Sequence, residues 1–167
     1  LDYADKTEGA ARSLLGLLND ILDFSKVEAG KMQLELEPFA LSRLLDELST
    51  ILSSNLGSKN VDLLFDVDPD IPATLVGDAL RIKQVLITRG GSAVQYAGHG
   101  HVVFGRRMLA RHTDRVRLEI SVVDSGIGIA PENQARIFNA FTQAESNTTR
   151  RFGGTGLGLV ISKRLIR

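Results

Sequence analysis

Residues 124–130 read Asp-Ser-Gly-Ile-Gly-Ile-Ala, and they directly follow residues 116–124, which have the composition of a strand. A carboxylate at the end of a strand, beside a glycine turn, can accept a hydrogen bond from an exocyclic amine and so read adenine. Residues 153–159 read Gly-Gly-Thr-Gly-Leu-Gly-Leu and open a predicted helix. Glycines there let backbone N–H groups approach a phosphate closely, and a helix N-terminus adds favourable partial charge. Either cluster alone is more often a simple turn, but the two together predict a nucleotide site.

The segment between the two glycine clusters predicts a short helix followed by a loop. Residues 131–138 are expected to be helical, with Pro131 at a favoured first-turn position. Residues 139–154 are polar and bounded by glycine, which is typical of a loop. A last helix is expected to start near Thr155.

The chain before the first glycine cluster mixes helices with strands. Apolar residues at i, i+3 and i+4 predict helices over residues 1–28, 41–56 and 77–95, with Gly30 and Gly57 as stops after the first two. The leucine stripe of the first helix is too apolar for a lone surface helix. Periodicity alone leaves two interpretations of it open, a core helix of the same domain and a member of a helical bundle.

Strands are expected where apolar residues alternate or cluster. Alternation predicts a strand over residues 32–36 that ends at Pro38, and further strands are expected over residues 61–67 and 102–108. Residues 110–115 are polar and join the last of these to the strand over 116–124. Because helices and strands do not alternate strictly as β-α-β units, this order predicts an α/β fold with two layers, an α/β sandwich.

Composition excludes several classes of protein. The chain has 167 residues, of which 43% are hydrophobic and 24% charged, as in a globular domain. Twenty basic residues balance twenty acidic ones, which argues against a nucleic-acid partner. The absence of cysteine excludes disulfides and thiolate chemistry. No apolar run approaches the roughly 20 residues that cross a bilayer, and we expect the chain to be a fragment, because it begins and ends inside predicted helices.

Taken in order, the motifs resemble those of sensor histidine kinases. Residues 124–128 are similar to the first glycine box of that family, residues 136–141 (Arg-Ile-Phe-Asn-Ala-Phe) to its phenylalanine box, and residues 151–159 to its second glycine box. Residues 19–31 resemble the end of the second dimerisation helix and the linker of hybrid-type kinases, and residues 77–87 resemble the start of the asparagine-box helix. The resemblance covers nearly the whole chain.

The resemblance implies a fold and a domain division. The expected fold is the Bergerat-type ATP-binding sandwich of the wider GHKL superfamily, preceded by one helix of a dimerisation helical hairpin. Residues 1–29 would be part of the dimerisation and phosphoacceptor domain. Residues 30–167 would be the ATP-binding catalytic domain.

The resemblance also assigns roles to individual residues. Asp124 would bind the adenine amine, and Gly126 and Gly128 would shape the turn beneath the base. Phe138 and Phe141 would anchor the ATP lid, residues 142–152, although both could equally serve as ordinary core aromatics. The second glycine box would bind the phosphates through its backbone amides; its cofactor-binding residues are Gly154, Thr155, Gly156, Leu157 and Gly158. Either Arg150 or Arg151 would reach the γ-phosphate from the lid.

The asparagine box departs from the family pattern. Two asparagines four residues apart are expected there, the second of which supplies a carboxamide oxygen to Mg²⁺. Thr88 and Ser92 occupy these two catalytic positions here, and Gln95 replaces the family's lysine. A serine hydroxyl is a shorter ligand, so we expect Ser92 to be a weak Mg²⁺ ligand. The pair Gly90-Gly91 costs about 0.8–1 kcal/mol per glycine in a helix, which predicts local looseness.

Two functional hypotheses follow from the family. In the first, the domain binds ATP with Mg²⁺ and transfers the γ-phosphate to a histidine of its dimerisation domain, with activity reduced by the degenerate asparagine box. The alternative to that reduction is tolerated drift with full activity. In the second hypothesis the protein is a weak or inactive pseudokinase that regulates other histidine kinases by dimerising with them.

The family also implies partners and a location. A response regulator or receiver domain would take the phosphoryl group, and the parent protein would be a homodimer in the cytoplasm or the cytoplasmic portion of a membrane-bound sensor. The chain's own histidines, His99, His101 and His112, lack the surroundings of a phosphoacceptor, so the acceptor is expected upstream or on another protein.

Two other nucleotide-binding classes fit the sequence poorly. A gyrase-like or chaperone-like ATPase needs a glutamate as general base at the position of Thr88, and threonine cannot act as a base near neutral pH. A Rossmann dinucleotide site needs a glycine cluster after the first strand and an acidic residue about 20 positions later. Neither glycine cluster of this chain meets both conditions.

Overall fold

The computed structural model describes residues 2–139 and 156–166. They form two compact units, which are Leu34–Gly128 and the combination of Leu1–Gln33 with Ile129–Arg167. The expected domain division between residues 29 and 30 stays a prediction.

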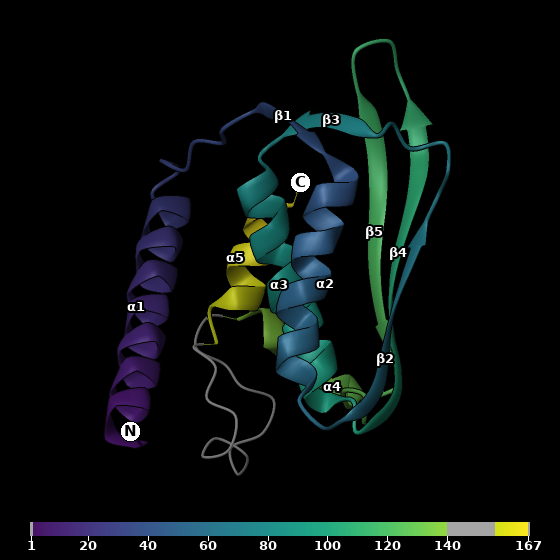
Figure 1. Cartoon of the computed structure of the whole chain (residues 1–167). Coiled ribbons are helices and arrows are strands. Elements are labelled where there is room, and N and C mark those ends of the chain that lie inside the picture. Colours follow the sequence, from purple (N-terminus) through teal and green to yellow (C-terminus); the bar gives the residue numbers. More distant parts are fainter. Residues whose placement is uncertain (1, 140–155, 167) are drawn as a thin grey trace. The chain divides into compact units, whose positions relative to one another are not determined.

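The unit Leu34–Gly128 is built on a three-stranded sheet with the order β2-β4-β5 (Figure 1). Strand β2 (Asn60–Val67) runs parallel to β4 (His99–Arg111), and β4 runs antiparallel to β5 (Val116–Asp124). The strands predicted over residues 61–67, 102–108 and 116–124 are therefore confirmed. Strand β4 is longer than expected, because it begins at His99 and continues to Arg111.

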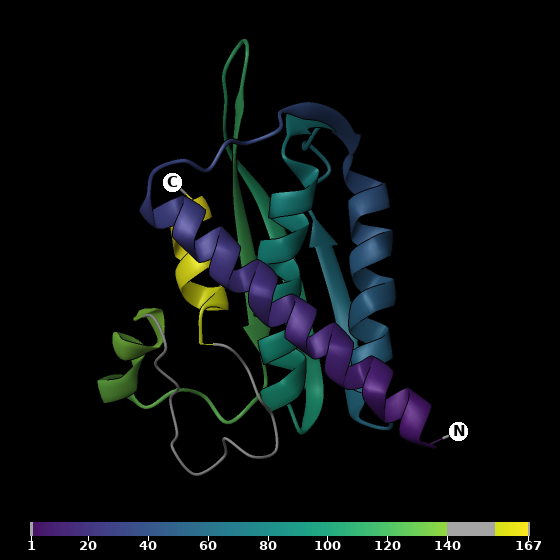
Figure 2. The same cartoon turned by 90° about the vertical axis from the view of Figure 1, so that its left-hand side faces the viewer.

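Helices α2 (Leu41–Leu56) and α3 (Ala79–Tyr96) pack on one face of this sheet (Figures 1 and 2). Helix α2 has the predicted bounds and stops at Gly57, whose φ of 57° favours glycine. Helix α3 starts two residues later than expected, because the Asp78 carboxylate caps it by accepting a hydrogen bond from Arg81 N at 3.0 Å. The buried core between the layers includes Leu48, Leu52, Leu86, Val94, Val102 and Phe104. The two-layer α/β sandwich is confirmed.

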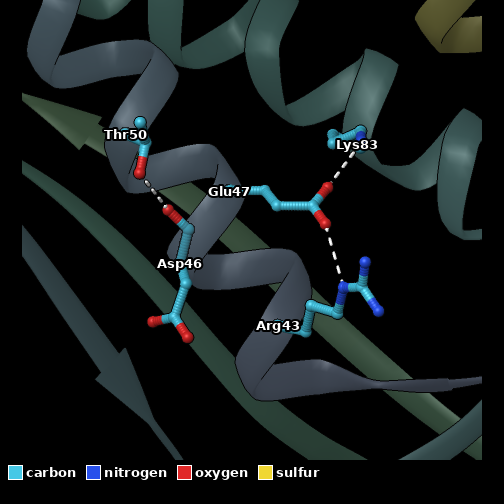
Figure 3. A network of polar contacts seen from close by, with 5 residues as sticks. All are labelled: Arg43, Asp46, Glu47, Thr50 and Lys83. Carbon is cyan, nitrogen blue, oxygen red and sulfur yellow. Dashed lines mark hydrogen bonds and ion pairs between the residues drawn. The ribbon is translucent and has the colours of Figure 1, made fainter.

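A polar network on the outer side of the helical layer joins α2 to α3 (Figure 3). Glu47 of α2 accepts hydrogen bonds from Lys83 Nζ of α3 at 2.7 Å and from Arg43 Nε at 3.2 Å. The bond from Lys83 is the main cause, and that from Arg43 the second, of a pKa of Glu47 below its usual value. The network fixes the start of α3 relative to α2, but its exposure limits its contribution to stability.

The strand predicted over residues 32–36 is wrong. These residues form no strand, and the first strand of the chain is β1 (Glu37–Ala40), which contains Pro38. It pairs antiparallel with β3 (Thr74–Gly77), a strand that the sequence analysis did not identify. An alternating segment becomes a strand only where another strand offers hydrogen bonds, and here the pairing with β3 begins only at Glu37. In this two-stranded sheet each strand has an open edge, where the missing N–H of a proline is tolerated.

The glycine pair inside α3 does not interrupt the helix. A Cβ added to Gly90 would lie 2.5 Å from Phe104 Cζ and 2.8 Å from Leu52 Cδ1, whereas one added to Gly91 would meet nothing within 4 Å. The structure therefore corrects the expectation of local looseness at Gly90. The missing side chain of Gly90 lets α3 pack closely against the core. Only Gly91 carries the cost of glycine in a helix with no compensating contact.

This difference predicts opposite effects of the same substitution at neighbouring positions. Gly90→Ala should lower the free energy of unfolding by about 1–3 kcal/mol, because the added methyl overpacks the core. Gly91→Ala should raise it by up to about 1 kcal/mol through helix propensity. Urea denaturation of the two variants provides the measurement. Equal shifts of the two midpoints would contradict the packing seen at Gly90.

The second unit contains α1 (Asp2–Glu28), α4 (Pro131–Gln134), the 3₁₀ helix η1 (Arg136–Phe138) and α5 (Gly158–Leu165). Helices at 1–28 and 131–138 are thereby confirmed, the second as two short pieces. Within this unit Arg164 Nη2 lies 2.9 Å from Glu28 Oε1.

The apolar stripe of α1 is largely exposed. Its members Leu14, Leu15, Leu18, Ile21 and Leu22 each expose between 49% and 59% of their surface, so α1 is not a core helix in this chain. Among the helices that the structure describes, none combines the length and apolarity of a membrane span.

Candidate nucleotide-binding site

The site is centred on Asp124, the last residue of β5. Its Oδ1 accepts a hydrogen bond from Gly126 N at 2.8 Å, which closes a local turn of the kind that aspartate favours. The side chain is exposed. Because Oδ1 is engaged with the backbone, Oδ2 is the oxygen left to accept a hydrogen bond from a ligand amine.

The glycines of this turn have distinct roles. A Cβ at Gly126 would lie 2.6 Å from Asp124 Oδ1 and 2.9 Å from the backbone oxygen of Tyr96, so glycine is required for the end of α3 to approach the turn. Gly128 has a φ of 73°, which favours glycine for conformational reasons. The structure thus brings the Asp124 turn together with the last residue of α3.

Ser125 anchors the same turn to the start of β4. Its Oγ donates to the backbone oxygen of His99 at 2.9 Å and accepts from His101 N at 3.0 Å. Gly100, with a φ of 100°, lies directly against Ser125 Oγ and has no room for a Cβ. The sequence analysis missed this contribution, because no local signal links Ser125 to residues about two dozen positions earlier.

Thr88 and Ser92 lie on α3, about two turns and one turn before its end, respectively. Both are half-buried, and both hydroxyls donate back along the helix, Thr88 Oγ1 to Gln84 O at 2.9 Å and Ser92 Oγ to Thr88 O at 3.0 Å. Such bonds hold the oxygens close to the helix backbone. Each oxygen keeps lone pairs for a ligand or a cation, but neither side chain reaches as far as an asparagine.

Acidic ligands for a metal are also scarce. In residues 2–139 and 156–166, no group of three or more histidine, cysteine, aspartate or glutamate side chains could hold an ion.

The remaining predicted site residues belong to the other unit or lie outside the described residues. Phe138 ends η1, with Lys163 Nζ 5.3 Å from its ring centroid. Leu157 is buried, Gly156 has a φ of 68°, and Gly158 is the first residue of α5. Phe141, Gly154, Thr155, Arg150, Arg151 and the lid fall in residues 140–155, outside the described part. The convergence of both glycine clusters on one ligand stays a prediction.

Comparisons with known proteins show the family to which the chain belongs. Residues 77–167 match the family described as "Histidine kinase-, DNA gyrase B-, and HSP90-like ATPase". Sensor histidine kinase GacS of Pseudomonas protegens is 46% identical over 166 residues, which are 99% of this chain and 18% of GacS. Signal transduction histidine-protein kinase BarA of Escherichia coli K12 is 39% identical over 165 residues, again 99% of this chain and 18% of BarA. The chain therefore spans less than a fifth of the length of these relatives.

Solved structures show the same fold. Full-length ShkA in complex with AMPPNP matches with a TM-score of 0.77 and 33% identity, over 98% of this chain and 33% of ShkA. Histidine kinase ThkA in complex with the response regulator TrrA matches with a TM-score of 0.62 and 25% identity, over 96% of this chain and 42% of that chain.

The sheet is covered on one face by two helices and carries an aspartate–glycine turn at the end of β5, which places the domain in the α/β sandwich class. The chain belongs to the histidine kinase-, DNA gyrase B- and HSP90-like ATPase family. Within it, the chain corresponds to the catalytic, ATP-binding domain of two-component sensor histidine kinases.

Proposed function

We propose that this domain binds ATP through Asp124 and presents the γ-phosphate to a histidine on a dimerisation domain. The observation that carries the proposal is the Asp124 turn, in which Gly126 N engages Oδ1 and leaves Oδ2 to accept the exocyclic amine of adenine. Gly126 and Gly128 keep side chains away from the base, and Ser125 holds the turn to β4. The second glycine box, including Gly156 and Gly158, supplies backbone amides for the phosphates.

Phosphoryl transfer depends mainly on positioning and on charge neutralisation, so the asparagine-box positions decide how active the domain is. When bound, Mg²⁺ would neutralise phosphate charge. Thr88 and Ser92 offer it neutral hydroxyls that are bonded to their own helix, which supports a reduced dependence on Mg²⁺ and reduced phosphotransfer. The wider parent protein would act in the cytoplasm and hand the phosphoryl group to a response regulator or receiver domain, as the complex of ThkA with TrrA suggests.

The same two hydroxyls favour a second candidate function, a regulatory pseudokinase. Such a protein would keep the adenine site but transfer phosphate poorly, and it would act by dimerising with itself or with other histidine kinases. The exposed apolar stripe of α1 supports dimerisation in both proposals.

A nucleotide titration with and without Mg²⁺ separates these proposals. We expect wild-type protein to bind a fluorescent ATP analogue more tightly in Mg²⁺ than in EDTA, but only slightly. Equal affinities in the two conditions would favour the pseudokinase over the kinase. Ser92→Asn should make binding Mg²⁺-dependent, with an affinity gain of about tenfold, the equivalent of about 1.4 kcal/mol. Ser53→Asn, on the exposed face of α2, is the matched control and should behave as wild type.

Three results would overturn parts of this account. Absence of nucleotide binding in every condition would remove the proposed function. A strong Mg²⁺ effect in wild type, unchanged in Ser92→Asn, would show that the hydroxyls are competent ligands. A Mg²⁺ effect created equally by Ser53→Asn would show that the asparagine box is not its cause.

A further inference from the structure

The end of α3 is held by a lysine from a distant part of the chain. Lys59 lies between α2 and β2, and its Nζ donates to the backbone oxygens of Val94 at 2.8 Å, Gln95 at 2.8 Å and Ala97 at 3.3 Å. Helix α3 has no basic residue in its own last turn. Lys59 therefore satisfies carbonyls that the helix leaves without an intrahelical donor, and places a positive charge where the helix dipole favours one.

The carbonyl that Lys59 does not bind in this stretch is the one that faces the nucleotide turn. Tyr96 lies between Gln95 and Ala97, and its backbone oxygen would be 2.9 Å from a Cβ at Gly126. The Tyr96 backbone thus determines how closely the turn can approach α3. By holding the carbonyls on both sides of Tyr96, the ammonium group fixes the surface against which Gly126 packs.

The internal bond of the turn runs from Gly126 N to Asp124 Oδ1 at 2.8 Å, and Ser125 ties the turn to β4. A displacement of the last turn of α3 would therefore be transmitted to Gly126, and through it to the carboxylate orientation.

We propose that Lys59 is a positioning residue for adenine recognition, which acts through the C-terminal carbonyls of α3 on the Asp124 turn. This inference rests on the proposed function of that turn. Lys59 touches no ligand in this account. Its loss should weaken binding of the adenine moiety itself rather than contacts to the phosphates.

The test compares Lys59→Met with Lys59→Arg and with Lys83→Met. Lys59→Met removes the ammonium donors and should raise the Kd for both adenosine and ATP by about tenfold, as orienting residues around other binding sites do. Lys59→Arg keeps a charged donor and should recover most of the affinity. Lys83→Met removes the bond to Glu47 near the start of α3, so it controls for general loosening of the helix.

A second measurement does not depend on nucleotide. Hydrogen exchange of the Gly126 amide should accelerate in Lys59→Met relative to the core amides of β4, and should be unchanged in Lys83→Met. If wild type binds no nucleotide but the exchange result holds, the proposed function is wrong, whereas the effect of Lys59 on the Asp124 turn is supported. If wild type binds nucleotide and Lys59→Met leaves both the Kd and the exchange rate unchanged, the positioning role is wrong.

Discussion

Asp124→Asn is expected to lower the affinity for ATP by about 10- to 100-fold, since a hydrogen bond to a charged group contributes about 1.5–3 kcal/mol and each 1.4 kcal/mol is tenfold. Asparagine can keep its carbonyl oxygen in the position of Oδ1, where it still accepts from Gly126 N. Its NH₂ group then replaces Oδ2 and turns a donor towards the adenine amine. The substitution therefore tests recognition without removing the turn.

The measurement is a nucleotide titration by calorimetry, together with thermal unfolding in the absence of ligand. Asp114→Asn is the matched control, because Asp114 is an exposed aspartate of the same unit that pairs with neighbouring Arg115. We expect Asp124→Asn to unfold at the wild-type temperature and to remain far from saturated with ATP at concentrations that just saturate Asp114→Asn. Unchanged affinity in Asp124→Asn would mean that adenine is read elsewhere.

Structure could be predicted from the sequence where the deciding interactions join residues close along the chain, and not where they join distant residues. Both ends of helix α2 could be predicted correctly, because its leucine spacing and Gly57 are local signals. The error at residues 32–36 arose because a strand needs a partner, and β3 begins 37 residues after the start of β1. Alternation alone does not report such a partner.

The same limit applies to the site. Asp124 and Gly126 could be identified because the motif is contiguous. The groups that support them, Ser125 on His99 and Lys59 on Val94, act across 26 and 35 residues of sequence. Serine and lysine are common at surfaces, so nothing in their local sequence distinguishes these two from others of the same type.

A buried arginine in β4 is a second feature with no sequence signal. Arg106 exposes 2% of its surface, and its Nε, Nη1 and Nη2 have no hydrogen-bond partner among the described residues. Its Cζ lies 5.5 Å from the ring centroid of Phe65, which stacks on Phe104 at 5.2 Å. Burial lowers the pKa of the Arg106 guanidinium, and nearby Asp66 opposes the shift.

The direction of this pKa shift indicates a cost to stability. Because the folded-state pKa lies below the unfolded one, folding disfavours the protonated guanidinium. The penalty is complete at any pH below the folded-state pKa and disappears only as the pH rises beyond it. At neutral pH the protein therefore carries the full cost of a desolvated charge. The contact with Phe65 offsets part of this cost, by about 2 kcal/mol when a cation–π pair is desolvated.

Arg106→Met should accordingly raise the free energy of unfolding by about 1–4 kcal/mol, the range in which replacing buried ionic groups with apolar ones of similar size stabilises proteins. Methionine keeps an unbranched side chain against Phe65 and can make a sulfur–aromatic contact, whereas alanine would leave a cavity. Urea denaturation at neutral pH measures the change. Arg107→Met, at the adjacent exposed position of the same strand, should shift stability by no more than about 0.5 kcal/mol. A loss of stability in Arg106→Met greater than that in Arg107→Met would show that the native guanidinium is paired, and that burying it does not oppose folding.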